Sequence, residues 1–136
     1  MNRCFRAPRR TALLTLALLG WSLSPLAHAQ NQPRIFPAKA LRGTLVVTQP
    51  PLISMDGQAA QLSPGARIRS PQNIVLLPSH LANQKLTVNY TREMLGLVHD
   101  VWILTPDEAA RKPWPTTPEE AQRWEFSPAA QTWTRR

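Results

Sequence analysis

Residues 84–104, QKLTVNYTREMLGLVHDVWIL, contain the clearest secondary-structure signal in this chain. Apolar residues occupy every second position over 86–90, which is typical of a half-buried β-strand. Gly96 closes a short connection, and a second strand is predicted over residues 97–105. The centre of that strand, residues 101–104, is apolar on both faces, as in strands that lie between two layers. We expect the protein core to form one layer, and the C-terminal tail or a partner to form the other.

The segment before this strand pair has the spacing of further short strands, with turn signals about every eight to twelve residues. The strongest is Asp56-Gly57, a two-residue hairpin signal, because glycine readily takes a positive φ. A second turn is predicted at Ser-Pro-Gly, residues 63–65. The pattern favours a mainly β domain over residues 41–105, a small antiparallel barrel or sandwich of about five to six short strands.

The order of turn, alternating strand, glycine and returning strand in residues 84–104 resembles small bacterial β-barrels of the oligonucleotide/oligosaccharide-binding (OB) or SH3-like type. Residues 34–108 also resemble small uncharacterised exported proteins of proteobacteria. The resemblance implies a barrel fold. It implies no particular activity, because small barrels perform many unrelated functions.

The first 29 residues are typical of a cleaved bacterial signal peptide. Four arginines precede an uncharged, Leu- and Ala-rich stretch over residues 11–27, and Ala27-His28-Ala29 has the small-x-small pattern of a cleavage site. Cleavage is predicted between Ala29 and Gln30, which would make the protein periplasmic or secreted. Whether the general secretory or the twin-arginine route is used stays open, because Arg9-Arg10 fits the second only loosely.

Cleavage would remove the only cysteine, Cys4, so the mature chain would have no disulfide, thiolate metal site or cysteine nucleophile. It would also remove four of the sixteen basic residues and leave twelve against eight acidic ones, a formal charge of +4. These charges are scattered, so no nucleic-acid partner is predicted. No stable membrane insertion is expected after cleavage.

Two segments flank the predicted β domain. Residues 30–40 contain two prolines and are expected to form an extended lead-in. Residues 106–136 form a tail rich in Pro and Trp, in which Thr105–Arg111 is echoed by Thr117–Arg123. Each copy begins with Thr at an N-cap, then Pro, with Glu three residues after the cap. The tail is therefore predicted to contain short helices.

Trp114, Trp124 and Trp133 are the candidate binding residues. Tryptophan rings stack well on sugars and on partner side chains, so these residues could form a recognition surface for an envelope protein or a cell-wall glycan. The alternative is that they cover the second face of a small domain that has little other core. For Trp102, burial in the domain is the favoured interpretation.

The alternative function is a periplasmic copper-handling protein that uses His80 and His99, with Met55 as a possible third ligand. No catalytic motif is found, no cofactor is expected, and Asp100 is predicted to face away from its neighbour His99. The sequence therefore predicts a non-catalytic exported binding or accessory module of the bacterial envelope.

Overall fold

The computed structural model describes residues 33–136, which form one contact unit. The predicted signal peptide, residues 1–29, its cleavage site between Ala29 and Gln30, and residues 30–32 lie outside the described residues. Within residues 33–136, no helix has both the length and the apolar character needed to cross a bilayer.

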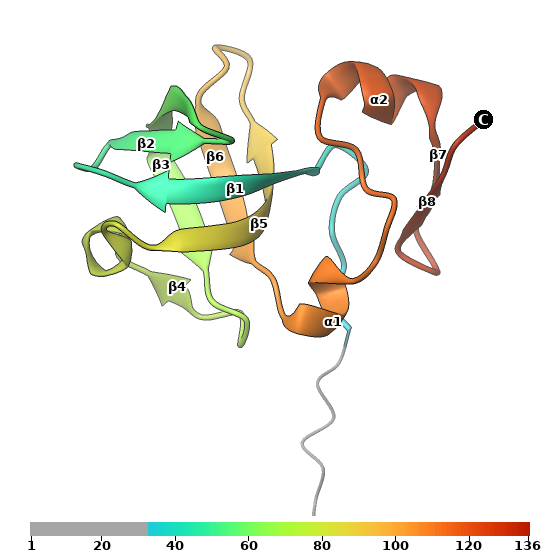
Figure 1. The fold of residues 1–136 in the computed structure, drawn as a ribbon, viewed down its shortest axis with the longest axis horizontal. Coiled ribbons are helices and arrows are strands. Elements are labelled where there is room, and N and C mark those ends of the chain that lie inside the picture. Colours follow the sequence, from blue (N-terminus) through green and yellow to red (C-terminus); the bar gives the residue numbers. More distant parts are fainter. Residues whose placement is uncertain (1–32) are drawn as a thin grey trace, which may run out of the picture. The chain divides into compact units, whose positions relative to one another are not determined.

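Five strands close a mixed β-barrel, and one short extra strand lies at its edge (Figure 1). The strands are β1 (Leu41–Val47), β2 (Leu52–Met55), β3 (Gln58–Arg69), β4 (Val75–Leu76), β5 (Lys85–Arg92) and β6 (Val98–Ile103). Around the barrel the order is β1-β2-β3-β6-β5, with β5 pairing back onto β1, while β4 pairs only with the end of β3. The prediction of a small, mainly β fold with few short helices is confirmed.

The prediction that all strands are antiparallel is wrong in one place, because β3 runs parallel to β6. Parallel neighbours need a long crossover connection rather than a tight turn. Here the crossover contains β4, a 3₁₀ turn η1 (Pro78–Leu81) and β5. Local turn signals predict hairpins between consecutive strands, but they contain no information about which distant strands meet.

The turn predicted at residues 63–65 is also wrong, because these residues lie inside the twelve-residue strand β3. The first part of β3 pairs with β2, and its pairing with β6 shifts register between Leu62 and Arg67. Proline is tolerated at such an irregularity because it has no ladder hydrogen bond to lose there. By contrast, the Asp56-Gly57 hairpin is confirmed, and both residues have the positive φ (52° and 79°) of a two-residue turn.

The barrel core is almost entirely aliphatic. Its buried residues are Leu41, Leu45, Val47, Ile53, Met55, Leu62, Ile68, Leu81, Val88, Tyr90, Val98, Val101 and Ile103. The alternation predicted in β5 holds for Val88 and Tyr90, but Asn89 and Thr91 on the other face are buried as well. Asn89 accepts a hydrogen bond from Arg42, so this outer face of the barrel is covered and does not face solvent.

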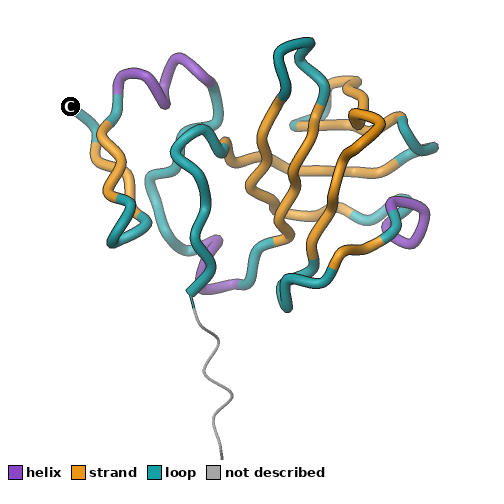
Figure 2. The backbone as a smooth tube through the Cα atoms, turned by 180° about the vertical axis from the view of Figure 1, so that it is seen from behind, coloured by secondary structure: helices purple, strands orange, loops and turns teal. Residues whose placement is uncertain are grey.

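The cover is a second layer made of residues 33–40 and 104–136, beside the barrel and beyond the start of β1 (Figures 1 and 2). Its elements are α1 (Pro106–Ala109), α2 (Pro118–Arg123), β7 (Glu125–Ser127) and β8 (Thr132–Thr134). The predicted N-caps Thr105 and Thr117 are both present, and Thr105 forms a complete capping box with Glu108. The β7–β8 hairpin was not predicted, because three-residue strands are too short to show a period.

The second layer has its own core of Phe36, Ala40, Leu104, Trp114 and Trp133. Phe36 contacts Trp102 of β6 edge-to-face, with 5.8 Å between ring centroids, and contacts Trp114 in the same way at 5.9 Å. β6 therefore lies between two layers, as its sequence indicates: Val101 faces the barrel core, and the half-buried Trp102 packs on the second core. The aromatic residue that contacts Trp102 comes from the segment before β1.

Candidate binding groove

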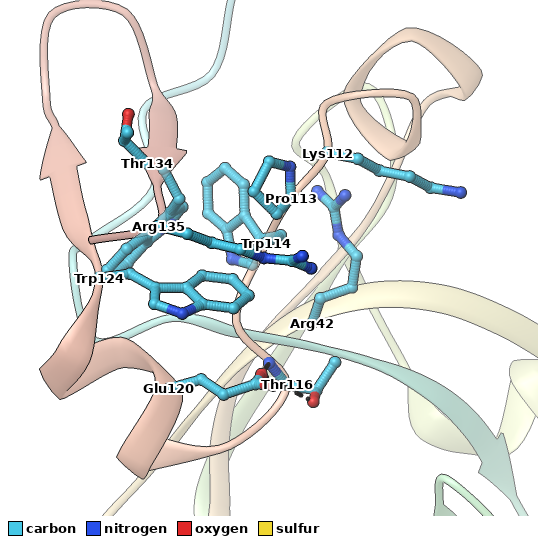
Figure 3. Close-up of a pocket in the computed structure, with 10 residues that line it drawn as sticks. Arg42, Lys112, Pro113, Trp114, Thr116, Glu120, Trp124, Thr134 and Arg135 are labelled. Atoms are coloured by element: carbon cyan, nitrogen blue, oxygen red, sulfur yellow. Dashed lines mark hydrogen bonds between the residues drawn. The ribbon is translucent and has the colours of Figure 1, made fainter.

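The three tryptophans singled out in the sequence, Trp114, Trp124 and Trp133, line one groove of the second layer (Figure 3). Its volume is about 740 Å³, within the range of small-molecule sites. The other lining residues are Arg42, Lys112, Pro113, Thr116, Glu120, Thr134 and Arg135. The groove thus joins β1 to three parts of the chain that come much later in the sequence: the segment between the two helices, α2 and β8.

Trp114 is held rigidly at the base of the groove. Its indole nitrogen donates a hydrogen bond to the carbonyl of Ala40 at 3.0 Å, and the carbonyl of Pro115 accepts one from the Arg42 backbone at 2.8 Å. These two bonds attach the segment between α1 and α2 to the start of β1. Trp114 is consequently 95% buried and presents little of its ring to a ligand.

Trp133 and Trp124 differ in exposure. Trp133 is buried at the centre of β8, directly opposite Phe126 of β7, with 4.9 Å between the ring centroids. Its indole N–H has no hydrogen-bond partner within residues 33–136, although a buried indole N–H usually has one. Trp124, at the C-terminal end of α2, is only half-buried and offers the accessible aromatic surface.

Three cations and one carboxylate line the groove. The guanidinium of Arg42 lies 4.9 Å from the Trp114 ring centroid, and that of Arg135 lies 5.0 Å from the Trp124 ring centroid. Burial lowers the pKa of Arg42 to about 10, although the nearby Glu108 raises it and Arg111 lowers it further. The carboxylate is Glu120, which accepts hydrogen bonds from the backbone and hydroxyl of Thr116 (Figure 3).

Arg42 is positioned by a buried network under the groove. It donates to the backbone carbonyls of Glu108, Ala109 and Arg111, at and just after the end of α1. Glu108 in turn forms a buried ion pair with Arg34. The sequence analysis missed Arg42, Arg135 and this network, because no local pattern distinguishes these arginines from solvent-exposed ones.

The structure places the two candidate copper ligands on separate elements. His80 is exposed in η1, His99 lies in β6, and Met55 is buried in the barrel core. Nδ1 of His99 is within hydrogen-bond distance, 2.8 Å, of the Ser63 hydroxyl. Across residues 33–136, no three His, Cys, Asp or Glu side chains gather in a way that could hold a metal ion. The copper hypothesis remains a prediction that this arrangement does not favour.

Ser63 and His99 are a nucleophile type and a base type in contact, so the pair bears on hydrolysis. An activated serine usually has a third group that orients the base. Asp100, the carboxylate next in the chain, instead pairs with Arg69 at 3.2 Å and with Arg67 at 3.6 Å. Ser63 itself is 95% buried. The pair is therefore better explained as a hydrogen bond between β3 and β6.

Comparisons of the chain with protein-family models, with curated proteins and with solved structures found no match. The groove is therefore the feature from which a function can be inferred.

Proposed function

We propose that the protein is a non-catalytic binding module, exported to the bacterial envelope, and that its groove binds a cell-wall glycan. The observation that supports this most is the meeting of Trp114, Trp124 and Trp133 in one groove. An accessible indole face beside hydroxyl and charged groups suits a sugar, which has both an apolar face and many hydroxyls. Binding sites for small ligands generally combine an apolar lining with a few polar groups in this way.

A glycan fits the groove better than a folded protein partner does. Ten residues line the groove, whereas a protein interface of standard size uses roughly 20–30 residues on each side. The accessible aromatic surface is also confined to Trp124, since Trp114 and Trp133 are each only 5% exposed. A small ligand unit such as one or two sugar rings matches this scale.

The charges of the groove support binding rather than cleavage. Glycoside hydrolysis generally uses a pair of carboxyl groups, one of them with a raised pKa. Glu120 is the only carboxylate among the ten lining residues. Hydrogen bonding from the Thr116 backbone lowers the pKa of Glu120 and outweighs the increase from desolvation, and the Thr116 hydroxyl lowers it further. Glu120 is thus ionised at neutral pH and is suited to accept hydrogen bonds from sugar hydroxyls.

Two further parts of the proposal concern compartment and fold family. Export depends on the predicted signal peptide, residues 1–29, and is tested by locating the processed protein in a periplasmic fraction. The likeness to OB-type barrels is supported by strand number, because the barrel closes with five strands.

The binding proposal is tested by isothermal titration calorimetry with soluble glycan fragments from bacterial cell walls. The wild-type protein should bind, and Trp124→Ala should reduce the affinity at least tenfold, because an accessible stacking surface is removed. Trp124→Phe should have an intermediate effect. Met94→Ala is the matched control, since Met94 is fully exposed in the β5–β6 loop and does not line the groove.

Circular dichroism of each variant shows whether the fold is retained. Equal glycan affinity in wild type and a folded Trp124→Ala would contradict the groove as the binding site. Capture of an envelope protein that is lost in Trp124→Ala, without any glycan binding, would replace the glycan with a protein partner.

A further inference from the structure

The groove has an excess of positive charge that the protein itself does not neutralise. Arg42, Lys112 and Arg135 line it against the single carboxylate of Glu120. Over residues 33–136, no carboxylate lies within ion-pair distance of Lys112 or Arg135, whereas the neighbouring Arg136 pairs with Glu125 at 3.6 Å. A groove of this kind is complementary to an anion.

The two guanidinium groups are not equally available. Arg42 is committed to four hydrogen bonds with Asn89 and the end of α1. Among the residues that the structure describes, Arg135 has no such bonds, and its guanidinium lies over the Trp124 ring. Figure 3 shows the Arg135 side chain extended across the groove above Trp124, towards Trp114 and the side from which Arg42 enters. Stacking on an aromatic face leaves the N–H edge of a guanidinium free, and this edge matches the two oxygens of a carboxylate.

The buried position of Arg42 adds to this preference. Desolvation makes its charge costly, and Glu108, the carboxylate whose charge raises the pKa of Arg42, is already paired with Arg34. A ligand anion in the groove would offset part of that cost, and Lys112 at the rim would add a weaker, salt-screened attraction. A neutral sugar would leave the excess positive charge of the groove without a counterpart.

We infer that the ligand of this groove is an acidic saccharide, whose carboxylate pairs with Arg135 while its ring packs against Trp124. The inference depends on the proposed glycan-binding function and names the chemical class that this function would recognise. Glu120, the one negatively charged residue among those that line the groove, accepts hydrogen bonds from ring hydroxyls of the same ligand.

The test uses one disaccharide in two forms, N-acetylglucosaminyl-N-acetylmuramic acid and its carboxyl methyl ester, which differ in the charge of the carboxylate and in one methyl group. Calorimetric titration of the wild-type protein should show the acid binding about tenfold more tightly than the ester, as expected for one charge-assisted hydrogen-bonded pair. Arg135→Gln should remove this preference. Arg136→Gln, the adjacent and matched substitution outside the groove, should retain it.

Three outcomes would overturn the inference, and they differ in whether the proposed glycan-binding function still stands. If acid and ester bind equally and both depend on Trp124, the glycan function stands and the acidic preference is wrong. If Arg135→Gln tightens the binding of both forms, Arg135 merely covers the indole. If neither form binds, and no other cell-wall fragment binds either, the proposed function fails together with the inference.

Discussion

The barrel and the second layer both bury apolar side chains and bond their backbone polar groups, but they do so with different residues. Twelve of the thirteen residues in the barrel core are aliphatic, and its backbone groups pair in strand ladders. The second core is mainly aromatic, and much of its backbone is irregular. Two arginine side chains bond backbone carbonyls where the second layer meets the barrel: Arg34 bonds those of Ser70 and Ile103 on the barrel side, and Arg42 bonds three at the end of α1.

This difference shows how residues 33–40 and 104–136, which contain no cysteine and only a two-stranded sheet, are attached to a barrel. A buried carbonyl without a partner is costly, and a guanidinium has five donors with which to bond several carbonyls at once. The aromatic rings supply large buried areas from few residues. The groove lies in this second layer, where arginines and tryptophans are concentrated for structural reasons before any ligand is considered.

The largest effect on stability is expected from Trp114→Ala, which should lower the free energy of unfolding by about 4 kcal/mol. The reason is the loss of a 95% buried ring that contacts Phe36, Phe126 and Trp133. Urea denaturation followed by circular dichroism measures it. Trp124→Ala, at a half-exposed site, should cost about 1 kcal/mol. An unchanged barrel transition in Trp114→Ala would show that the two layers unfold independently.

Arg34→Ala should lower the free energy of unfolding by about 3 kcal/mol, because it leaves the Glu108 carboxylate buried without its partner. The matched control is Arg136→Ala, which breaks an exposed ion pair with Glu125 and should change stability by less than about 0.5 kcal/mol. Thermal and urea unfolding of the two variants provide the comparison. Similar small losses in both would mean that the arginine network does not hold the second layer.

Gly43→Ala, in the barrel, should cost about 2 kcal/mol. A Cβ on Gly43 would lie 2.9 Å from the Asp56 carboxylate and 3.0 Å from the Tyr90 ring. Gly65→Ala is the control in another strand, because the nearest atom there, on His99, is at an ordinary 3.6 Å. Urea midpoints of the two variants test this. Equal midpoints would show that the hairpin at Asp56 adjusts freely and that the barrel is less tightly packed than the contacts imply.

The smallest expected effect is the pH dependence of the second layer. Burial raises the pKa of Glu108, but hydrogen bonds from Arg34 and the Thr105 backbone, with the charges of Arg34 and Arg111, bring it below its ordinary value. A carboxyl with a lowered pKa stabilises the folded state above its unfolded pKa of about 4.3, and this contribution is lost as the pH falls through the folded value.

Unfolding measured from pH 7 to pH 3 should therefore show wild type losing more stability than Glu108→Gln. The same slope in both proteins would remove Glu108 as a source of acid sensitivity.

Local signals were sufficient where a few adjacent residues decide the conformation. The strand β5, the positive-φ hairpin at Asp56-Gly57 and the N-caps Thr105 and Thr117 were all predicted correctly. The predicted exposure of one face of β5 was wrong, because Asn89 and Thr91 are buried. Local sequence signals gave wrong predictions where the conformation of a residue is set by contacts with distant parts of the chain. Pro64 and Gly65 lie in a strand because β3 passes from β2 to β6 at that point, and no neighbour of these residues in the sequence indicates it.

The amino-acid sequence alone was enough to establish a small, mainly β protein with short capped helices and to single out Trp114, Trp124 and Trp133, because periodicity, caps and aromatic content are local properties. Tertiary contacts alone established the parallel β3–β6 pair that closes the barrel, the aromatic second core and the arginines beside the tryptophans. These features depend on residues such as Arg42 and Arg135 that lie more than ninety positions apart. Only the folded chain brings them within reach of one ligand.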